Sequence, residues 1–338
     1  MIFSDCRRHI RALSGTILVV LALLCACTRP RSYIVSDGAM IGTTFHVCAE
    51  LQDLTAAELY AEIMRIEAEA RASMSIFDEN SLLNRINRNE TDSLDEHLIR
   101  NFTIARNIGL NIDSRYDITV KPLTDALGFA AKEAVADPDI DSLLTFVGYD
   151  KWSIDGCRIA KADPRVQFDL NSIAKGYTVD MVGRMLEEHG SHNYLVEVGG
   201  EVRCRGVNRS GDLWTIGIDT PYEGNMSPGV SMSGAVMLSD KSLATSGNYR
   251  RFHLDEQGNK IVHTINPLTG ESVDSRLLSA TVVTESCAEA DALATMFLAA
   301  GADEALKLAE KMRDSIGVFF ILDKDGEYEF FNTLDRQK

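Results

Sequence analysis

Apolar residues alternate with polar ones, or recur every three to four positions, through most of the chain, and this pattern predicts both strands and helices. Strands are expected at 33–35, 44–48, 166–170, 194–198, 202–205, 214–219, 236–239, 261–265 and 280–284, with hairpins over 152–159 and 318–331. Helices are expected over about 56–72, after Ser93, after Asp137-Pro138, from 171–177 to Gly190, and between Ser286 and Gly301. Because strands and helices alternate without a strict βαβ order, we expect an α+β fold of mixed sheets with flanking helices, in two lobes.

Local turn and cap signals support these boundaries. Capping boxes are expected at Thr55/Glu58, Ser93/Glu96 and Ser286/Glu289, and hairpin turns at Asp155-Gly156 and Asp325-Gly326. Gly199-Gly200 follows an apolar strand and is explained most simply as a tight turn.

The first thirty residues differ from the rest of the chain. Arg7, Arg8 and Arg11 precede an apolar stretch over 15–24 that is too short to cross a bilayer in a mature protein, which is typical of a secretory signal. The signal ends in Leu24-Cys25-Ala26-Cys27, which resembles a bacterial lipobox with Cys27 as the lipidated residue. A plain signal peptide cut near Ala26, or an uncleaved anchor, remains an alternative. All three place the body outside the cytoplasm.

These signals divide the chain into three parts. We expect a lipoprotein signal peptide at 1–26, a lipid-anchored N-terminus and tether at 27–36, and one folded domain at 37–338. The expected location is the periplasmic or other extracytoplasmic face of a membrane, most simply the inner membrane.

The chain of 338 residues is acidic, with a formal charge of −16 that becomes −18 when residues 1–26 are removed. Such a surface repels a nucleic-acid backbone, and no Lys/Arg cluster offsets it, so we expect no nucleic-acid partner. An anionic ligand would need local help from a metal ion or from oriented N–H groups.

Cysteines are scattered, without a CxxC pair or zinc-type spacing, so a zinc site is not expected. Oxidising surroundings would permit a disulfide among Cys48, Cys157, Cys204 and Cys287, but the sequence selects no pairing. We expect buried free thiols.

Two places carry candidate chemistry. The junction between the strand at 166–170 and the next helix is a possible anion site, because a helix N-terminus offers unpaired N–H donors and partial positive charge. Asp291 and Thr295 lie one turn apart on the helix after Ser286, so their oxygens face the same side and could bind a hard cation. A solvated polar helix face would have the same pattern.

An ordered series of motifs covers nearly all of the mature chain. It comprises Gly38-Ala39-Met40-Ile41-Gly42-Thr43, Met74-Ser75-Ile76-Phe77, Asn80-Ser81, Asn84-Arg85-Ile86-Asn87, Tyr116-Asp117-Ile118-Thr119-Val120, Pro122-Leu123, Gly128-Phe129, Asp169-Leu170-Asn171-Ser172-Ile173-Ala174-Lys175-Gly176-Tyr177 with Asp180, Val196-Glu197-Val198-Gly199-Gly200-Glu201, Ala244-Thr245-Ser246-Gly247-Asn248-Tyr249-Arg250, His263-Thr264-Ile265-Asn266-Pro267 with Thr269-Gly270, and Ala290-Asp291-Ala292-Leu293-Ala294-Thr295. In this order the motifs resemble the ApbE family of FAD:protein FMN transferases.

The resemblance implies an Mg²⁺-dependent enzyme that takes FAD as substrate and transfers FMN to a Thr or Ser hydroxyl of an acceptor protein, releasing AMP. It implies that Asp291 and Thr295, with the main-chain carbonyl near Ser172, hold Mg²⁺ against the FAD pyrophosphate. The FAD site would be lined by Met40, Phe77, Leu127, Gly128, Phe129, Asp169, Lys175 and Ile265. Without the resemblance, Met40 and Phe77 would be assigned to the core.

Two positions depart from the family pattern. Asn171-Ser172 stands where many members have Gly-Gly, and Asn266 stands where many have Asp. The first change is harmless if a backbone carbonyl is the ligand, whereas the second removes a carboxylate near the site.

An alcohol needs a base at neutral pH, and His263 is our candidate because an unperturbed imidazole titrates near neutrality. Lys175 could supplement the metal ion. His263 could equally act only as a hydrogen-bond donor.

Two other functions keep the same site: an Mg²⁺-dependent FAD pyrophosphatase and a non-catalytic FAD-binding lipoprotein. By resemblance, the acceptors would be extracytoplasmic subunits of Na⁺-translocating NADH:quinone reductase or related electron-transport complexes.

Overall fold

A computed structural model describes residues 32–334 except 130–133, 136, 223–224, 226–228, 250–251, 255–257 and 259. Residues Ile34–Lys338 form one compact unit. The predicted signal peptide at 1–26 and the lipidation site Cys27 lie outside the described residues.

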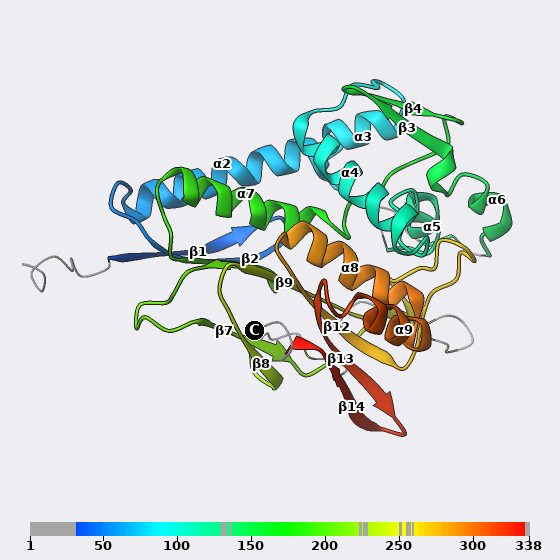
Figure 1. Cartoon of the computed structure of the whole chain (residues 1–338). Coiled ribbons are helices and arrows are strands. Elements are labelled where there is room, and N and C mark those ends of the chain that lie inside the picture. Colours follow the sequence, from blue (N-terminus) through cyan, green and yellow to red (C-terminus); the bar gives the residue numbers. More distant parts are fainter. Residues whose placement is uncertain are drawn as a thin grey trace, which may run out of the picture. The chain divides into compact units, whose positions relative to one another are not determined.

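The unit is built on an eight-stranded sheet, with its strands in the order β1-β2-β5-β6-β9-β12-β13-β14 (Figure 1). Its strands are β1 Tyr33–Met40, β2 Thr43–Glu50, β5 Tyr194–Val198, β6 Glu201–Arg205, β9 Lys241–Gly247, β12 Leu277–Thr284, β13 Gly317–Lys324 and β14 Glu327–Asn332. Every described pairing from β2 to β14 is antiparallel. The order of the strands in the sheet is also their order along the chain, so each strand lies beside the sheet strand that precedes or follows it in the sequence.

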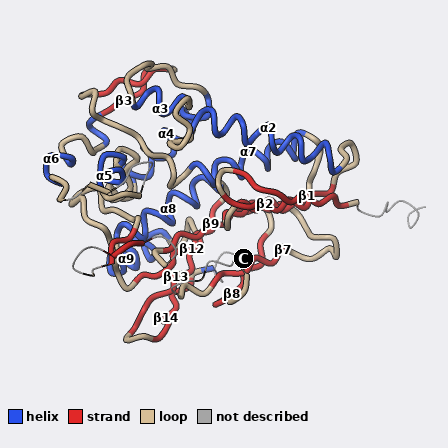
Figure 2. Tube along the Cα trace, turned by 180° about the vertical axis from the view of Figure 1, so that it is seen from behind, coloured by secondary structure: helices blue, strands red, loops and turns tan. Residues whose placement is uncertain are grey.

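Helices lie along one face of this sheet. The long helices α2, α7 and α8 lie side by side in both views, with α7 packed on β5 and β6 and α8 packed on β9 and β12 (Figures 1 and 2). The helices are α2 Ala56–Met74, α3 Leu82–Asn87, α4 Glu96–Asn111, α5 Lys121–Ala126, α6 Ile140–Leu144, α7 Ala174–Glu188, α8 Cys287–Ala300 and α9 Ala302–Met312, with a 3₁₀ turn η1 at Tyr149–Lys151. This arrangement confirms the α+β prediction.

Three two-stranded ribbons complete the described secondary structure. They are β3 Trp152–Asp155 with β4 Arg158–Lys161, β7 Trp214–Asp219 with β8 Met232–Leu238, and β10 Phe252–Leu254 with β11 Lys260–Val262. Figure 1 shows the β3–β4 ribbon beside α3 and α4, away from the large sheet. The β7–β8 ribbon lies on the side of the sheet opposite the long helices.

Most of the predicted caps and turns are confirmed. Thr55 and Glu58 form a reciprocal capping box at the start of α2. Ser286 accepts a hydrogen bond from the Glu289 N–H, and Gly301 ends α8. The hairpin glycines take positive φ values, including Gly199 and Gly200 between β5 and β6.

Two predicted helix starts were wrong by a few residues. Asp95, rather than Ser93, caps α4, because its carboxylate accepts the Leu98 N–H. Likewise, Asp139 caps α6, so this helix begins at Ile140 and not at the Asp137-Pro138 pair. In each case an aspartate two residues later supplied the capping oxygen.

The strand predicted at 166–170 is absent from the described secondary structure. A side chain takes the place of a neighbouring strand here: the Phe168 N–H donates to Asn87 Oδ1 at 2.8 Å, and Asn87 Nδ2 donates to the Phe168 carbonyl at 2.9 Å. The Asp169 N–H then donates to the Ile118 carbonyl. The apolar run at 166–170 is therefore buried without strand pairing.

Other differences concern boundaries and cysteines. The strand predicted at 33–35 is confirmed as the start of β1, so the tether that we drew to residue 36 extends too far. All four cysteines in the described residues are free thiols. We expected them to be buried, but Cys157 is exposed. No helix among the described residues is long and apolar enough to span a membrane.

Candidate active site

A cavity of about 1350 Å³ opens between the large sheet, the N-terminal end of α7 and the side of α8. It brings together nine predicted site residues from five separate segments of the chain. They are Met40, Phe129, Asp169, Ser172, Lys175, His263, Ile265, Asp291 and Thr295.

Eight of these nine are the residues that the resemblance assigns to FAD or Mg²⁺, and His263 is the candidate base. The size of the cavity exceeds the range of about 300–1000 Å³ that is usual for a single small-molecule site. The volume of this cavity is therefore consistent with a ligand larger than a typical small molecule.

Two buried aspartates hold α8 against α7, because each caps the helix that carries the other. Asp291, on α8 and 2% exposed, accepts the N–H of Gly176 in the first turn of α7 at 3.0 Å. Asp180, on α7, accepts the N–H groups of Cys287 and Ala288 in the first turn of α8 at 3.1 and 3.0 Å. Each carboxylate satisfies donors that a helix N-terminus leaves unpaired. The predicted anion site at the start of α7 is thus occupied in part by Asp291 itself.

Gly176 allows this close approach of the two helices. A Cβ at this position would lie 2.3 Å from the Cys287 carbonyl oxygen and 2.9 Å from the Ala288 nitrogen, both of them backbone atoms. We expect Gly176→Ala to lower the free energy of unfolding by about 1–3 kcal/mol, because an overpacked interface must separate. Urea denaturation measures this loss.

Gly234→Ala is the matched control for Gly176→Ala. Its Cβ would meet only Phe319, at an ordinary 3.5 Å, so we expect a change within about 0.5 kcal/mol. Equal stability of the Gly176 variant and this control would contradict the close-approach argument.

Thr295 and Ser172 line the same cavity as Asp291. The Thr295 hydroxyl lies 3.3 Å from the Ser246 hydroxyl, and the Ser172 hydroxyl lies 3.0 Å from that of Tyr116. Burial raises the pKa of Asp291, and the Lys175 ammonium opposes this rise. Because Asp291 is buried in a cavity wall, the alternative of a solvated polar helix face is wrong.

Lys175 forms an ion pair with Glu201, the first residue of β6, and both side chains line the cavity. Glu201 is 1% exposed, and burial raises its pKa against the effect of Lys175. Burial lowers the pKa of Lys175, but the carboxylates of Glu201 and Asp291 outweigh it, so the net shift is upward. Lys175 is therefore a cation in this site and not a base.

The predicted flavin-side residues separate into two groups. Met40, at the end of β1 and 3% exposed, lines the cavity together with Phe129, whose ring centre lies 6.4 Å from that of His263. Asp169 also lines it, and its two oxygens accept the Asn171 N–H and the Thr124 hydroxyl. Met40 therefore packs in the hydrophobic core and also lines the cavity.

Leu127, Gly128 and Phe77 do not line this cavity. Leu127 packs instead into a small apolar cluster with Leu123 and Ile265, and Gly128 takes a positive φ of 77° that turns the chain toward Phe129. Phe77 is 62% exposed, so in this structure its ring neither packs in the core nor faces the cavity.

The ApbE family model matches residues 41–320, which is most of the chain. The chain belongs to the ApbE family. It is 33% identical over 335 residues to the FAD:protein FMN transferase of Haemophilus influenzae, covering 94% of this chain and 95% of that protein. Flavin transferase ApbE from Vibrio cholerae matches in structure with a TM-score of 0.77 and 29% identity, covering 90% of this chain and 97% of that one. The apo form of the flavinyl transferase ApbE from Pseudomonas stutzeri gives a TM-score of 0.79 at 27% identity, covering 90% and 96%.

The structure shows where the two departures from the ApbE family pattern, Asn171-Ser172 and Asn266, lie relative to the cavity. Asn266 Oδ1 accepts the Leu268 N–H at 2.9 Å, so its side chain closes a local turn, and Asn266 does not line the cavity. Asn171 does line it, while the Ser172 side chain is engaged by Tyr116. The Asn266 departure therefore changes a turn rather than the cavity surface.

Asp180 and Glu201 belong to the ApbE motifs in the sequence, but sequence reasoning gave neither residue a role. Their partners lie far away along the chain: Asp180 contacts residues more than one hundred positions later, and Glu201 pairs with Lys175 from another element. An acidic residue between Val179 and Met181 in a predicted helix was the available sequence signal for Asp180.

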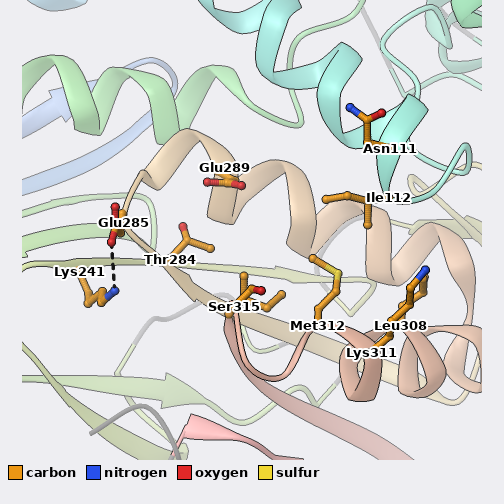
Figure 3. A pocket seen from close by; sticks show the side chains of 11 residues that line it. Asn111, Ile112, Lys241, Thr284, Glu285, Glu289, Leu308, Lys311, Met312 and Ser315 are labelled. Carbon is orange, nitrogen blue, oxygen red and sulfur yellow. Dashed lines mark ion pairs between the residues drawn. The ribbon is translucent and has the colours of Figure 1, made fainter.

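A second, smaller cavity of about 450 Å³ is lined by residues of α4, α8 and α9 and of the strands β9 and β12 (Figure 3). Its lining includes Glu289, Met312 and the Lys241–Glu285 ion pair, whose atoms are 3.7 Å apart. None of the predicted site residues lines it. The chemistry of this ApbE-family chain is therefore assigned to the larger cavity.

Proposed function

We propose that this chain is an FAD:protein FMN transferase that uses Mg²⁺ to move FMN from FAD onto a Thr or Ser hydroxyl of an acceptor protein. The observation that carries the proposal is the convergence of Asp291, Thr295 and Ser172 with Lys175 in one cavity. The function of the Haemophilus influenzae relative, an FAD:protein FMN transferase, supports it.

The donor set fits a hard divalent cation. Asp291 contributes a buried carboxylate, Thr295 a hydroxyl one helical turn later, and the Ser172 segment a main-chain carbonyl, and Mg²⁺ prefers such oxygen ligands. When bound, Mg²⁺ would supply charge neutralisation and orientation at the pyrophosphate oxygens of FAD.

The remaining residues have separate roles in the proposed reaction. The acceptor hydroxyl oxygen forms a bond to the FMN phosphorus, and the bond from that phosphorus to the bridging oxygen breaks, so AMP leaves with the bridging oxygen. His263 accepts the hydroxyl proton, and the Lys175 ammonium stabilises negative charge on the phosphates. Met40, Phe129 and Ile265 offer thioether, aromatic and aliphatic surface for the flavin.

Incubation with FAD, Mg²⁺ and a flavin-accepting redox subunit tests the proposal. We expect fluorescence that stays with the acceptor on a denaturing gel, together with one AMP per flavin attached. Free FMN with AMP would instead identify an FAD pyrophosphatase, and unaltered FAD would identify a binding protein. Either of these results contradicts the proposed transferase activity.

We further propose that the acceptor is an extracytoplasmic subunit of a redox complex, of the Na⁺-translocating NADH:quinone reductase type or a related one. The support is the predicted signal peptide at 1–26 and the lipobox-like Leu24-Cys25-Ala26-Cys27, which would anchor the enzyme to the outer face of the inner membrane. Cys27→Ser should then release the protein from the membrane fraction, which cell fractionation measures. Retention of this variant in the membrane would contradict lipidation at Cys27.

A further inference from the structure

The Lys175–Glu201 ion pair contains a carboxylate oxygen that the described fold does not use. Glu201 Oε1 binds the Lys175 ammonium, whereas Glu201 Oε2 is buried and has no hydrogen-bond partner among the described residues. Buried carboxylate oxygens are normally satisfied, because an unpaired one loses its hydration without replacement. Packing alone therefore does not explain an acidic residue at this position.

Lys175 lies within the electrostatic reach of two buried carboxylates. It pairs with Glu201 and also interacts with Asp291, the residue that we assign to the metal ion. An ammonium group and a divalent cation compete for the same carboxylate, since both carry positive charge and both need its oxygens. An ammonium group drawn toward Asp291 would therefore lower the affinity of this carboxylate for a cation.

The anchor for Lys175 is rigidly placed. Glu201 begins β6 directly after the Gly199-Gly200 turn, and β6 is paired on both sides, with β5 and with β9. Lys175 lies in the first turn of α7. The N–H of the following residue, Gly176, donates a hydrogen bond to the Asp291 carboxylate. The three residues thus come from a central strand and two packed helices, which fixes the relative positions of their backbones.

We propose that Glu201 is a positioning residue that holds the Lys175 ammonium away from Asp291 and so keeps the Asp291 carboxylate available to a divalent cation. This inference rests on the proposed function, because it takes Asp291 as a metal ligand. It assigns to Glu201 a task that is separate from binding the metal or FAD.

Mn²⁺ titration of the full-length protein without FAD, followed by the EPR signal of free Mn²⁺, tests this proposal. We expect Glu201→Gln to weaken Mn²⁺ binding by about 10- to 100-fold, the usual range for loss of a residue that orients a ligand. The double variant Glu201→Gln/Lys175→Met should regain most of this loss, because the competing ammonium is gone. Glu188→Gln, a control at an exposed carboxylate at the other end of α7, should bind Mn²⁺ as the wild type does.

A crystal structure of the Glu201→Gln variant adds a readout that does not depend on affinity. We expect Lys175 Nζ to lie within ion-pair distance of the Asp291 carboxylate. Lys175 in its original place would overturn the proposal, as would unchanged Mn²⁺ binding by Glu201→Gln. A double variant as weak as Glu201→Gln would also overturn it and would make Glu201 a direct ligand.

The same titration separates this inference from the proposed function. If the wild type binds Mn²⁺ and Asp291→Asn does not, the metal assignment holds, and only the result for Glu201 decides the inference. If Asp291→Asn binds Mn²⁺ as tightly as the wild type, the assignment of Asp291 to the metal fails and the inference fails with it.

Discussion

Asp291→Ala is expected to lower FMN transfer by at least about 1000-fold, because a metal ion that stabilises transition-state charge contributes several kcal/mol and each 1.4 kcal/mol is about tenfold in rate. Asp291 is the buried carboxylate of the proposed metal site and lies in the cavity wall beside Lys175. Initial rates of AMP release at saturating FAD and Mg²⁺ measure the loss.

A conservative variant separates chemistry from folding at this position. Asp291 also accepts the Gly176 N–H, so alanine removes a structural hydrogen bond as well. Asp291→Asn keeps an oxygen for that bond, and we expect it to melt within a few degrees of the wild type while being as inactive as alanine. Asp303→Ala, on the neighbouring helix α9, is the surface control and should remain fully active. An Asp291→Asn enzyme with wild-type turnover would remove Asp291 from the metal site.

Asp180→Ala is expected to have the largest effect on stability, lowering the free energy of unfolding by about 3–5 kcal/mol. The Asp180 carboxylate is 3% exposed and binds the Arg203 guanidinium at 2.8 Å as well as the Ser286 hydroxyl at 2.8 Å and two N–H groups at the start of α8. Its removal leaves a half-buried cation and several donors unpaired. Urea denaturation at neutral pH measures this change.

Asp314→Ala is the control for Asp180→Ala, because the Asp314 side chain is 98% exposed. We expect this substitution to change the free energy of unfolding by less than about 0.5 kcal/mol. If Asp180→Ala were destabilised by less than about 1 kcal/mol in the same assay, the reciprocal capping of α7 and α8 would not be a major source of stability.

The two capping aspartates also explain how the fold positions the site. Asp291 binds the start of α7, and Asp180 binds the start of α8, so each helix fixes the first turn of the other. Lys175 and Ser172 lie at the first of these ends, and Asp291 lies one turn into the second helix. The same contacts therefore stabilise the protein and set the spacing of the proposed ligands.

Strong local patterns allowed much of the fold to be predicted from the sequence. The bounds of β5 and β7 agree with the predicted strands at 194–198 and 214–219, because alternation is clear and turns bound both strands. The Thr55/Glu58 box located the start of α2 for the same reason. Short elements such as α5, which lacks a side-chain cap, were missed because six residues carry too little periodic signal.

Long-range contacts account for the remaining differences. Asn87 replaces a strand for Phe168 across 81 positions, and Asp291 caps α7 across 115 positions, so neither contact has a local signature. Asp291 and Thr295 could be proposed as cation ligands from their spacing on one helix, but their place in a shared cavity with Lys175 and His263 could not be predicted. The ordered motifs predicted a set of site residues, and the tertiary structure brings most of them together in one cavity.

A crystal structure of the enzyme with FAD and Mn²⁺, with anomalous scattering used to locate the metal, tests the central claim most directly. We predict an anomalous peak bound by the Asp291 carboxylate, the Thr295 hydroxyl and a carbonyl near Ser172, with the FAD phosphates on its open side and the flavin against Met40 and Phe129. Mn²⁺ bound away from Asp291, or FAD bound outside this cavity, would contradict the account.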